Sequence, residues 1–79
     1  MITHAYRATY TIQSIGRKFF RGILHRVPGK KVIVDRIMIN KTSKDFEIGK
    51  TYVIGGYHHD EPSEYGHKVI IEPMKVVSV

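Results

Sequence analysis

The sequence predicts a small all-β domain in which five strands close into a barrel. Short runs rich in β-branched and aromatic residues alternate with turn residues, and no stretch has the periodicity of a long helix. The 79 residues make one domain, residues 1–79, and leave no room for a second. Closing the sheet is the best way for such a chain to remove exposed strand edges.

The first strand is expected over residues 3–13, where threonines and tyrosines favour an extended backbone. Because side chains alternate along a strand, the apolar ones gather on a single face. That face carries Tyr6, Ala8, Tyr10 and Ile12. We expect Tyr10 in the core, together with Tyr52 from a later strand. Residues 14–16 end with a glycine and break the run.

The second and third strands are expected at about residues 17–27 and 31–39. Pro28 and Gly29 between them form a strong turn signal, because proline presets one turn angle and glycine accepts a positive φ. The third strand is apolar on both faces, which is typical of a strand that crosses a barrel interior.

Residues 40–50 have room for one helical turn at most, capped by Thr42 and ended by Gly49. Many barrels of the oligonucleotide-binding (OB) type have a helix between their third and fourth strands, which would be a stub in this chain. The strand pattern therefore predicts an OB-like barrel, with an SH3-like barrel as the alternative.

The fourth strand is expected at residues 51–57 and the last one at about 67–79. Gly55 and Gly56 predict a bulge or a close backbone approach within the fourth strand. Pro73 cannot donate a ladder hydrogen bond, so the last strand should bend there or lie at an edge.

A polar loop, residues 58–66, is expected between these two strands. With His67 it offers three histidines and three carboxylates within ten residues, a composition typical of metal sites. However, adjacent histidines such as His58 and His59 point in opposite directions along an extended segment. We therefore expect a solvated hairpin tip, with no metal and no cofactor.

The sequence lacks the signatures of an enzyme. It contains no glycine-rich phosphate loop and no nucleophile motif. The absence of cysteine excludes a thiol nucleophile, a disulfide scaffold and a zinc ribbon. Small nucleases use a histidine with an arginine, but the spacing of His25 and Arg21 gives no support for that arrangement. We expect no catalytic residues.

The balance of charge favours an acidic partner. Thirteen Lys and Arg against seven Asp and Glu give a net charge of +6. In so small a domain this charge suits nucleic acid, an acidic membrane surface or an acidic protein, although solubility alone can also explain it. No apolar run is long enough to span a bilayer, and the N-terminus lacks the layout of a signal peptide. A soluble, cytoplasmic protein without a membrane partner is expected.

Basic and aromatic residues alternate at the start of the second strand, where Arg17, Phe19 and Arg21 share one face. Such a face suits single-stranded DNA or RNA, because the cations follow the phosphates and the ring stacks on an unpaired base. Of Phe19 and Phe20, one is expected in the core. Tyr57 borders the polar loop and is expected to be exposed. The predicted nucleic-acid-binding residues are Arg17, Lys18, Phe19, Arg21, Lys30, Lys31 and Tyr57.

The second half of the chain resembles the filamentous-phage single-stranded-DNA-binding proteins. The resemblance lies in residues 46–54 (Phe-Glu-Ile-Gly-Lys-Thr-Tyr-Val-Ile), then Tyr65-Gly66, then residues 70–73 (Ile-Ile-Glu-Pro). It covers less than half of the chain, and the first forty residues share only strand rhythm and a basic hairpin. It implies an OB fold and a viral protein in the host cytoplasm that coats single strands cooperatively as a homodimer.

A protein-interaction module is the alternative function. A small phage-type inhibitor or an assembly subunit would turn the same basic face to an acidic protein partner. The nearly continuous apolar character of residues 31–39 and 67–79 could then mark a dimer seam or an edge that pairs with a partner strand.

Overall fold

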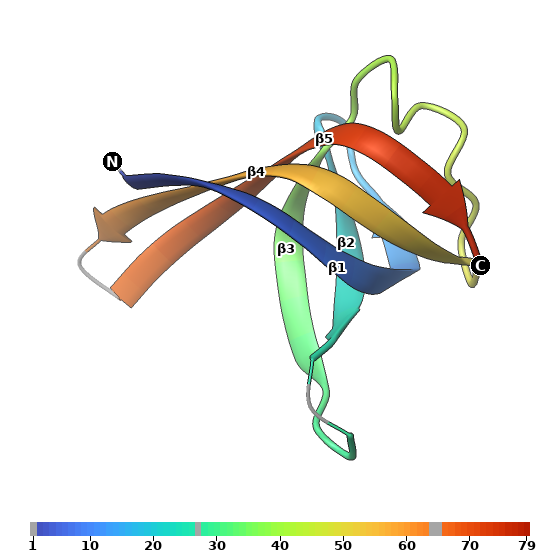
Figure 1. The fold of residues 1–79 in the computed structure, drawn as a ribbon, viewed down its shortest axis with the longest axis horizontal. Coiled ribbons are helices and arrows are strands. Elements are labelled where there is room, and N and C mark those ends of the chain that lie inside the picture. Colours follow the sequence, from blue (N-terminus) through green and yellow to red (C-terminus); the bar gives the residue numbers. More distant parts are fainter. Residues whose placement is uncertain (1, 27, 64–65) are drawn as a thin grey trace.

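Five strands and their connections make up the computed structural model, which describes residues 2–26, 28–63 and 66–79 (Figure 1). The strands are β1 (Ile2–Ile15), β2 (Phe19–His25), β3 (Val32–Met38), β4 (Thr51–Ser63) and β5 (Gly66–Ser78). Across the described ranges, no helix has the length and apolar character that crossing a bilayer requires.

The sheet closes on itself in the order β1-β2-β3-β5-β4, with β4 returning to β1. All strand contacts are antiparallel except that of β3 with β5, which is parallel and has one register pair, Ile37 opposite Ile71. A parallel contact between β3 and β5 requires a Greek-key path, as in OB-type barrels, rather than a simple meander. The predicted five-stranded barrel is confirmed, and its strand order is OB-like.

β1 pairs with two different strands along its length. Its residues 2–11 pair with β4 and its residues 9–15 pair with β2, with a register shift between Ile12 and Ser14. In Figure 1, β1, β4 and β5 cross the upper part of the molecule together, while the β2–β3 hairpin projects downward. The sheet therefore has two outer surfaces, one over β1–β4–β5 and one over β1–β2–β3.

The core lies inside the closed sheet and contains the rings that the sequence predicts there. Tyr10 is fully buried and Tyr52 is 7% exposed, which confirms both predictions. The ring of Phe46, from the segment after β3, lies 5.2 Å from the Phe20 ring and 4.3 Å from the Tyr52 ring. The buried core residues are Tyr10, Ile12, Phe20, Leu24, Ile37, Phe46, Tyr52, Ile54 and Ile71.

The segment from β3 to β4 forms turns rather than a helix. Asn40 rather than Thr42 caps the first turn, because its side-chain oxygen accepts the backbone N–H groups of Thr42 (2.9 Å) and Ser43 (3.2 Å). Ser43 is fully buried and its hydroxyl donates to the Met38 carbonyl at 2.7 Å. Gly49 adopts a φ of 87° where the last turn ends. This positive φ agrees with the prediction that Gly49 ends the turn.

The prediction of a polar loop at residues 58–66 is wrong for most of these residues. β4 continues to Ser63 and β5 begins at Gly66, so the two strands form one long hairpin at the left of Figure 1. In a hairpin that projects from the barrel, the backbone hydrogen bonds between the two strands form without apolar side chains. The polar composition of these residues therefore gives no sign of a strand. Tyr65 lies outside the described residues.

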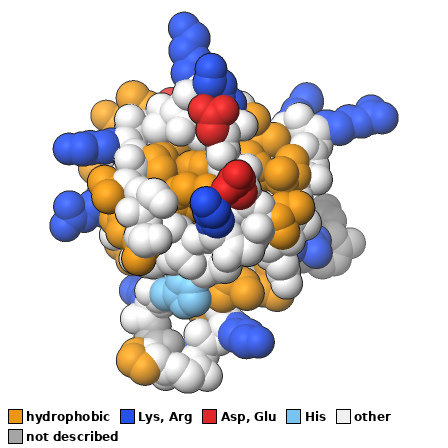
Figure 2. Space-filling model, turned by 90° about the vertical axis from the view of Figure 1, so that its right-hand side faces the viewer, with side chains coloured by type: hydrophobic (Ala, Val, Ile, Leu, Met, Phe, Trp, Pro, Cys, Tyr) orange, Lys and Arg blue, Asp and Glu red, His pale blue; other side chains and the backbone are white. Residues whose placement is uncertain are grey.

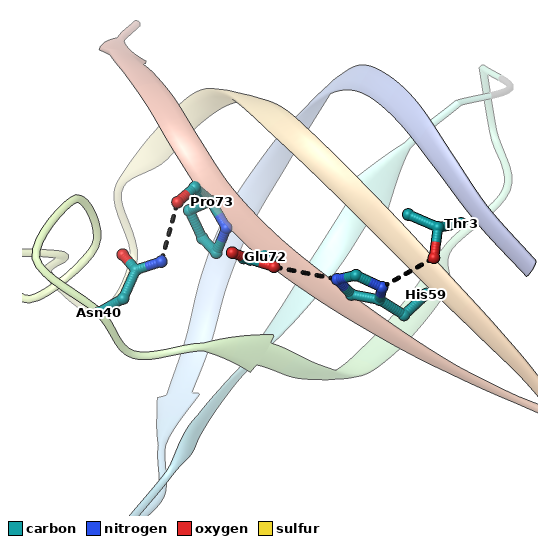
Figure 3. Close-up of polar contacts among 5 residues, drawn as sticks. All are labelled: Thr3, Asn40, His59, Glu72 and Pro73. Carbon is teal, nitrogen blue, oxygen red and sulfur yellow. Dashed lines mark hydrogen bonds and ion pairs between the residues drawn. The ribbon is translucent and has the colours of Figure 1, made fainter. Parts of the chain in front are cut away.

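The tandem glycine in β4 lies at a register shift with β5 and at the predicted close backbone approach. Gly55 pairs with Lys75 and Gly56 with Pro73, so the extra residue of the bulge, Met74, is on β5. A Cβ atom on Gly56 would overlap the carbonyl oxygen of Glu72, so only glycine fits there. Pro73 is buried beside this bulge, and its carbonyl accepts a hydrogen bond from the Asn40 amide at 2.8 Å (Figure 3).

β3 is not buried on both faces, contrary to the prediction. Val32 and Ile33 are exposed, and Ile37 is the fully buried residue of this strand. The reason is that the β2–β3 hairpin extends beyond the barrel. A register shift between Phe20 and Gly22 bends it away from β5.

Candidate nucleic-acid interface

The net charge of the protein is concentrated on one hairpin. Residues 17–36, which include β2, β3 and the turns at both ends of β2, contain seven of the thirteen Lys and Arg but one of the seven Asp and Glu. This segment alone accounts for the net charge of +6, because acidic and basic residues balance over the rest of the chain. The positive field of the molecule therefore originates from the hairpin.

Arg17 and Lys18 form the exposed tip of the turn between β1 and β2. The turn is closed by a hydrogen bond from the backbone N–H of Gly16 to the carbonyl of Phe19, at 2.8 Å. A Cβ atom on Gly16 would lie 3.0 Å from that same carbonyl oxygen, so glycine suits the tight turn. The two cations are thus held at the start of β2 with their side chains in solvent.

Alternation along β2 separates the two phenylalanines. Phe20 is 1% exposed and belongs to the core, as one of the two was predicted to do. Phe19 and Arg21 are on the opposite, outer side of the strand, where Phe19 is partly exposed and Arg21 is exposed. The predicted alternation of ring and guanidinium on one outer face is therefore present in β2.

Arg21 forms an ion pair with Asp35 on β3. Its Nε lies 2.8 Å from a carboxylate oxygen, and the two side chains are 55% and 62% exposed. An ion pair this exposed contributes about 0–1 kcal/mol. A phosphate group that reaches Arg21 can therefore displace Asp35 at little cost.

Lys30 and Lys31 lie at the other end of the hairpin, after a turn in which Gly29 adopts a φ of 81°. Both lysines are exposed. At about 3.3 Å per residue, the seven residues of β2 separate them from Arg17 and Lys18 by roughly 20 Å. The predicted cations thus form two groups, with the outer face of β2 between them, rather than one cluster.

Tyr57 is 43% exposed, as expected, but the structure does not bring it to the hairpin. It lies on β4 opposite Ala5, whereas the pairing of β1 with β2 begins only at Thr9. Tyr57 therefore belongs to the outer surface of β1–β4–β5, separately from the other predicted residues.

A cleft of about 720 Å³ opens where the hairpin separates from β5, beyond the single Ile37–Ile71 register pair. Its walls combine apolar side chains from β2, β3 and β5 with polar groups. The polar lining residues are His4, Arg26, Asp35, Arg36 and His58. On a different side of the molecule, seen from the right of Figure 1, Figure 2 shows Lys and Arg side chains projecting from the edges of a partly hydrophobic face.

The two adjacent histidines of β4 point in opposite directions, as expected for an extended segment. His58 turns inward, with Nε2 3.0 Å from the Tyr10 hydroxyl oxygen, and its ring packs 4.5 Å from that of Tyr6. Burial, followed by the nearby charges of His4 and His59, lowers the pKa of His58 below its ordinary value. The ring is therefore neutral at pH 7.

His59 turns outward and joins three strands. Its ring contacts the Thr3 hydroxyl at 3.1 Å and the Glu72 carboxylate at 3.0 Å (Figure 3). Where the chain is described, no group of three His, Cys, Asp or Glu side chains is positioned to hold a metal ion. His67 lies where side chains are not described.

The binding residues predicted from the sequence omit four cations that face the grooves. Arg26 and Arg36 line the main cleft, and Arg7 and Lys75 line a groove beside Tyr57. The signal for Arg7 was available, since it lies on the polar face predicted for residues 3–13. Arg36 was missed because it falls within a strand interpreted as apolar on both faces.

No protein-family model, curated protein or solved structure matches this chain.

Proposed function

We propose that this protein binds single-stranded nucleic acid with little sequence preference and has no catalytic activity of its own. The observation that carries this proposal is the hairpin of residues 17–36, which holds the whole net charge of +6 and has a partly exposed Phe19 on its outer face. Arg17 and Lys18 at one end, Arg21 in the middle, and Lys30 and Lys31 at the other contact successive phosphates. Phe19 stacks on a base between them.

A single strand fits this surface better than a duplex does. The ring of Phe19 is flanked by flexible cations rather than presented on a helix or ribbon that could enter a groove, and stacking requires an unpaired base. The roughly 20 Å between the two cation groups is the span of a short stretch of strand that follows β2. The likeness to phage single-stranded-DNA-binding proteins supports the same proposal, and the homodimer it implies is part of that proposal.

The test is a charge reversal with a matched control. The triple variant Arg17→Glu, Arg21→Glu and Lys30→Glu should lose binding to a labelled single-stranded oligonucleotide by at least 100-fold and keep its circular dichroism spectrum. The control reverses the same number of charges at exposed positions between β3 and β4, as Lys41→Glu, Lys44→Glu and Lys50→Glu. Equal losses in the two variants would show that net charge alone matters and would refute the hairpin as the binding site.

A second candidate function rests on the edge of β3. This strand pairs with β5 through one register pair, and Val32 and Ile33 beyond that pair are exposed. An extended segment of an acidic protein could add to this edge by backbone hydrogen bonds and bring its carboxylates near Arg26 and Arg36. Absence of oligonucleotide binding, together with 1:1 capture of an acidic β-strand peptide, would favour this function.

A further inference from the structure

Two adjacent glycines in β4 have different reasons to be glycine. Gly56 is required by the bulge, because a Cβ atom there would overlap the backbone of β5. At Gly55 the nearest atoms to a Cβ would be a Lys75 carbonyl oxygen at 3.7 Å and the Cγ of Arg7 at 3.9 Å, which are ordinary contacts. The fold therefore accepts a side chain at position 55. Glycine within a strand often marks a bulge or a place where another backbone or a ligand approaches closely, and over Gly55 the space is open.

Gly55 forms the floor of an open groove of about 500 Å³ on the outer surface of β1–β4–β5. In the register of the sheet, Arg7 on β1 and Lys75 on β5 lie directly opposite Gly55, one on each side. Both cations are exposed and both line the groove. The missing side chain thus leaves a gap between two positive charges.

An aromatic ring stands at one end of this gap. Tyr57 lies two residues further along β4, so its side chain is on the same outer face as the gap. The carboxylate of Glu72, which lies opposite Tyr57 in the register of the sheet, is hydrogen-bonded to His59 at 3.0 Å. The groove thus has an aromatic ring at one end and two cations on either side of a backbone without a side chain. This arrangement is complementary to one nucleotide, because the base can stack on the ring while the phosphate lies between the two cations.

We propose that the groove of Arg7, Gly55, Tyr57 and Lys75 is a second nucleotide subsite, in which Tyr57 stacks on a base and the two cations bracket its phosphate. This inference rests on the proposed function, since it extends the path of the same single strand. β1 connects the two surfaces: Thr9 and Thr11 follow Arg7 on its outer face, and Thr11 contacts His25 of β2 at 2.7 Å. A strand that leaves the hairpin crosses β1 at these hydroxyl groups to reach the groove.

The experiment fills the groove without disturbing the fold. Gly55→Leu places a side chain between the two cations at a position where a Cβ makes ordinary contacts, and its matched control is Val53→Leu, two residues earlier on the same outer face. Fluorescence anisotropy with labelled oligothymidylates of 4 to 20 nucleotides should show that Gly55→Leu weakens binding of the longer oligonucleotides about tenfold. The control should bind as the wild type does. The shortest oligonucleotides, which occupy the hairpin alone, should bind both variants equally.

A second variant covers the case in which Gly55→Leu does not fold. Arg7→Glu with Lys75→Glu changes exposed side chains and should reduce the magnitude of the log–log salt slope on long oligonucleotides by about 0.7, the contribution of one phosphate. Free thymidine monophosphate, tested in competition, distinguishes a subsite for a nucleotide within a strand from a site for the free nucleotide. Wild-type affinity and slope in both groove variants would overturn the subsite and leave the proposed function intact. Failure of the wild type to bind any oligonucleotide would overturn both.

Discussion

The hydroxyl oxygen of Tyr10 lies 3.0 Å from Nε2 of His58, inside the mouth of the barrel. Burial, with Tyr6 nearby, raises the pKa of Tyr10, and burial lowers that of His58, so both groups are neutral at pH 7. The neutral imidazole can then accept the proton of the tyrosine hydroxyl. The hydrogen bond joins β1 to β4 at the point where the closed sheet opens into the cleft.

This pairing predicts that the folded state loses stability in mild acid. Because the pKa of His58 is lower in the folded than in the unfolded chain, the unfolded chain binds more protons as the pH falls through 6.5 towards the lowered value. The contribution of His58 to stability is therefore fully present above pH 6.5 and is lost as the pH falls through that window. Urea denaturation at pH 7.5, 6.5 and 5.5 measures the change.

His58→Gln isolates this contribution, because glutamine keeps an acceptor for Tyr10 and does not titrate. The other titratable groups around the ring, His4, His59 and Tyr6, remain in the variant. We expect the wild type to lose more stability than the variant between pH 7.5 and 5.5. Parallel losses in the two proteins would mean that His58 is not the responsible group.

The two glycines of β4 should respond differently to alanine. Gly56→Ala forces a Cβ against the Glu72 carbonyl and should cost about 1–3 kcal/mol. Gly55→Ala makes ordinary contacts and restricts the unfolded chain, so it should be neutral or stabilise by up to about 1 kcal/mol. Thermal denaturation of the two variants measures both changes in stability. A large loss of stability in Gly55→Ala would contradict the inference that the fold accepts a side chain at position 55.

The two phenylalanines of β2 should separate stability from binding. Phe20→Ala removes a fully buried ring and should cost about 3–5 kcal/mol, much of the total stability of so small a domain. Phe19→Ala should change stability little and weaken single-strand binding about 5- to 150-fold, as expected for one stacked base. Denaturation and anisotropy on the same preparations provide both readouts. Wild-type affinity of Phe19→Ala for single strands would show that the Phe19 ring is not part of the binding interface.

Asn40 should matter more than Thr42, although the sequence favours Thr42 as the cap. Asn40→Ala removes the acceptor for two backbone N–H groups and the hydrogen bond to the Pro73 carbonyl, so a loss of about 1–2 kcal/mol is expected. Thr42 is exposed, and Thr42→Ala should stay within about 0.5 kcal/mol of the wild type. A larger loss of stability in Thr42→Ala than in Asn40→Ala, measured by urea denaturation, would show that Thr42 is the cap.

The sequence predicts the closed sheet well because its signals are local. Alternation places Tyr10 and Tyr52 in the core, and turn residues such as Pro28 and Gly29 mark where strands end. The tandem glycine likewise predicts the close backbone approach of β4 to β5. Each of these depends on neighbours a few residues away, which a single sequence contains.

What the sequence could not predict depends on contacts between distant strands. From His58 onward the polar composition predicts a loop, because the strands that pair with these residues, β5 and β1, are distant in the sequence. Likewise, the sequence predicts one set of binding residues that includes Tyr57 and the hairpin cations, but strand order places Tyr57 over β1–β4–β5. The groove between Arg7 and Lys75 exists only once both strands flank Gly55.

The most direct test of single-strand binding is a salt series of fluorescence anisotropy with single- and double-stranded DNA and RNA. Contacts with about three to five phosphates predict a log–log slope of roughly −2 to −3.5 on single strands, and weaker binding to duplexes. A preference for single strands with that slope is the expected result, and it would also show whether DNA or RNA is preferred. No binding at low salt, or equal binding to duplexes, would contradict the proposed function.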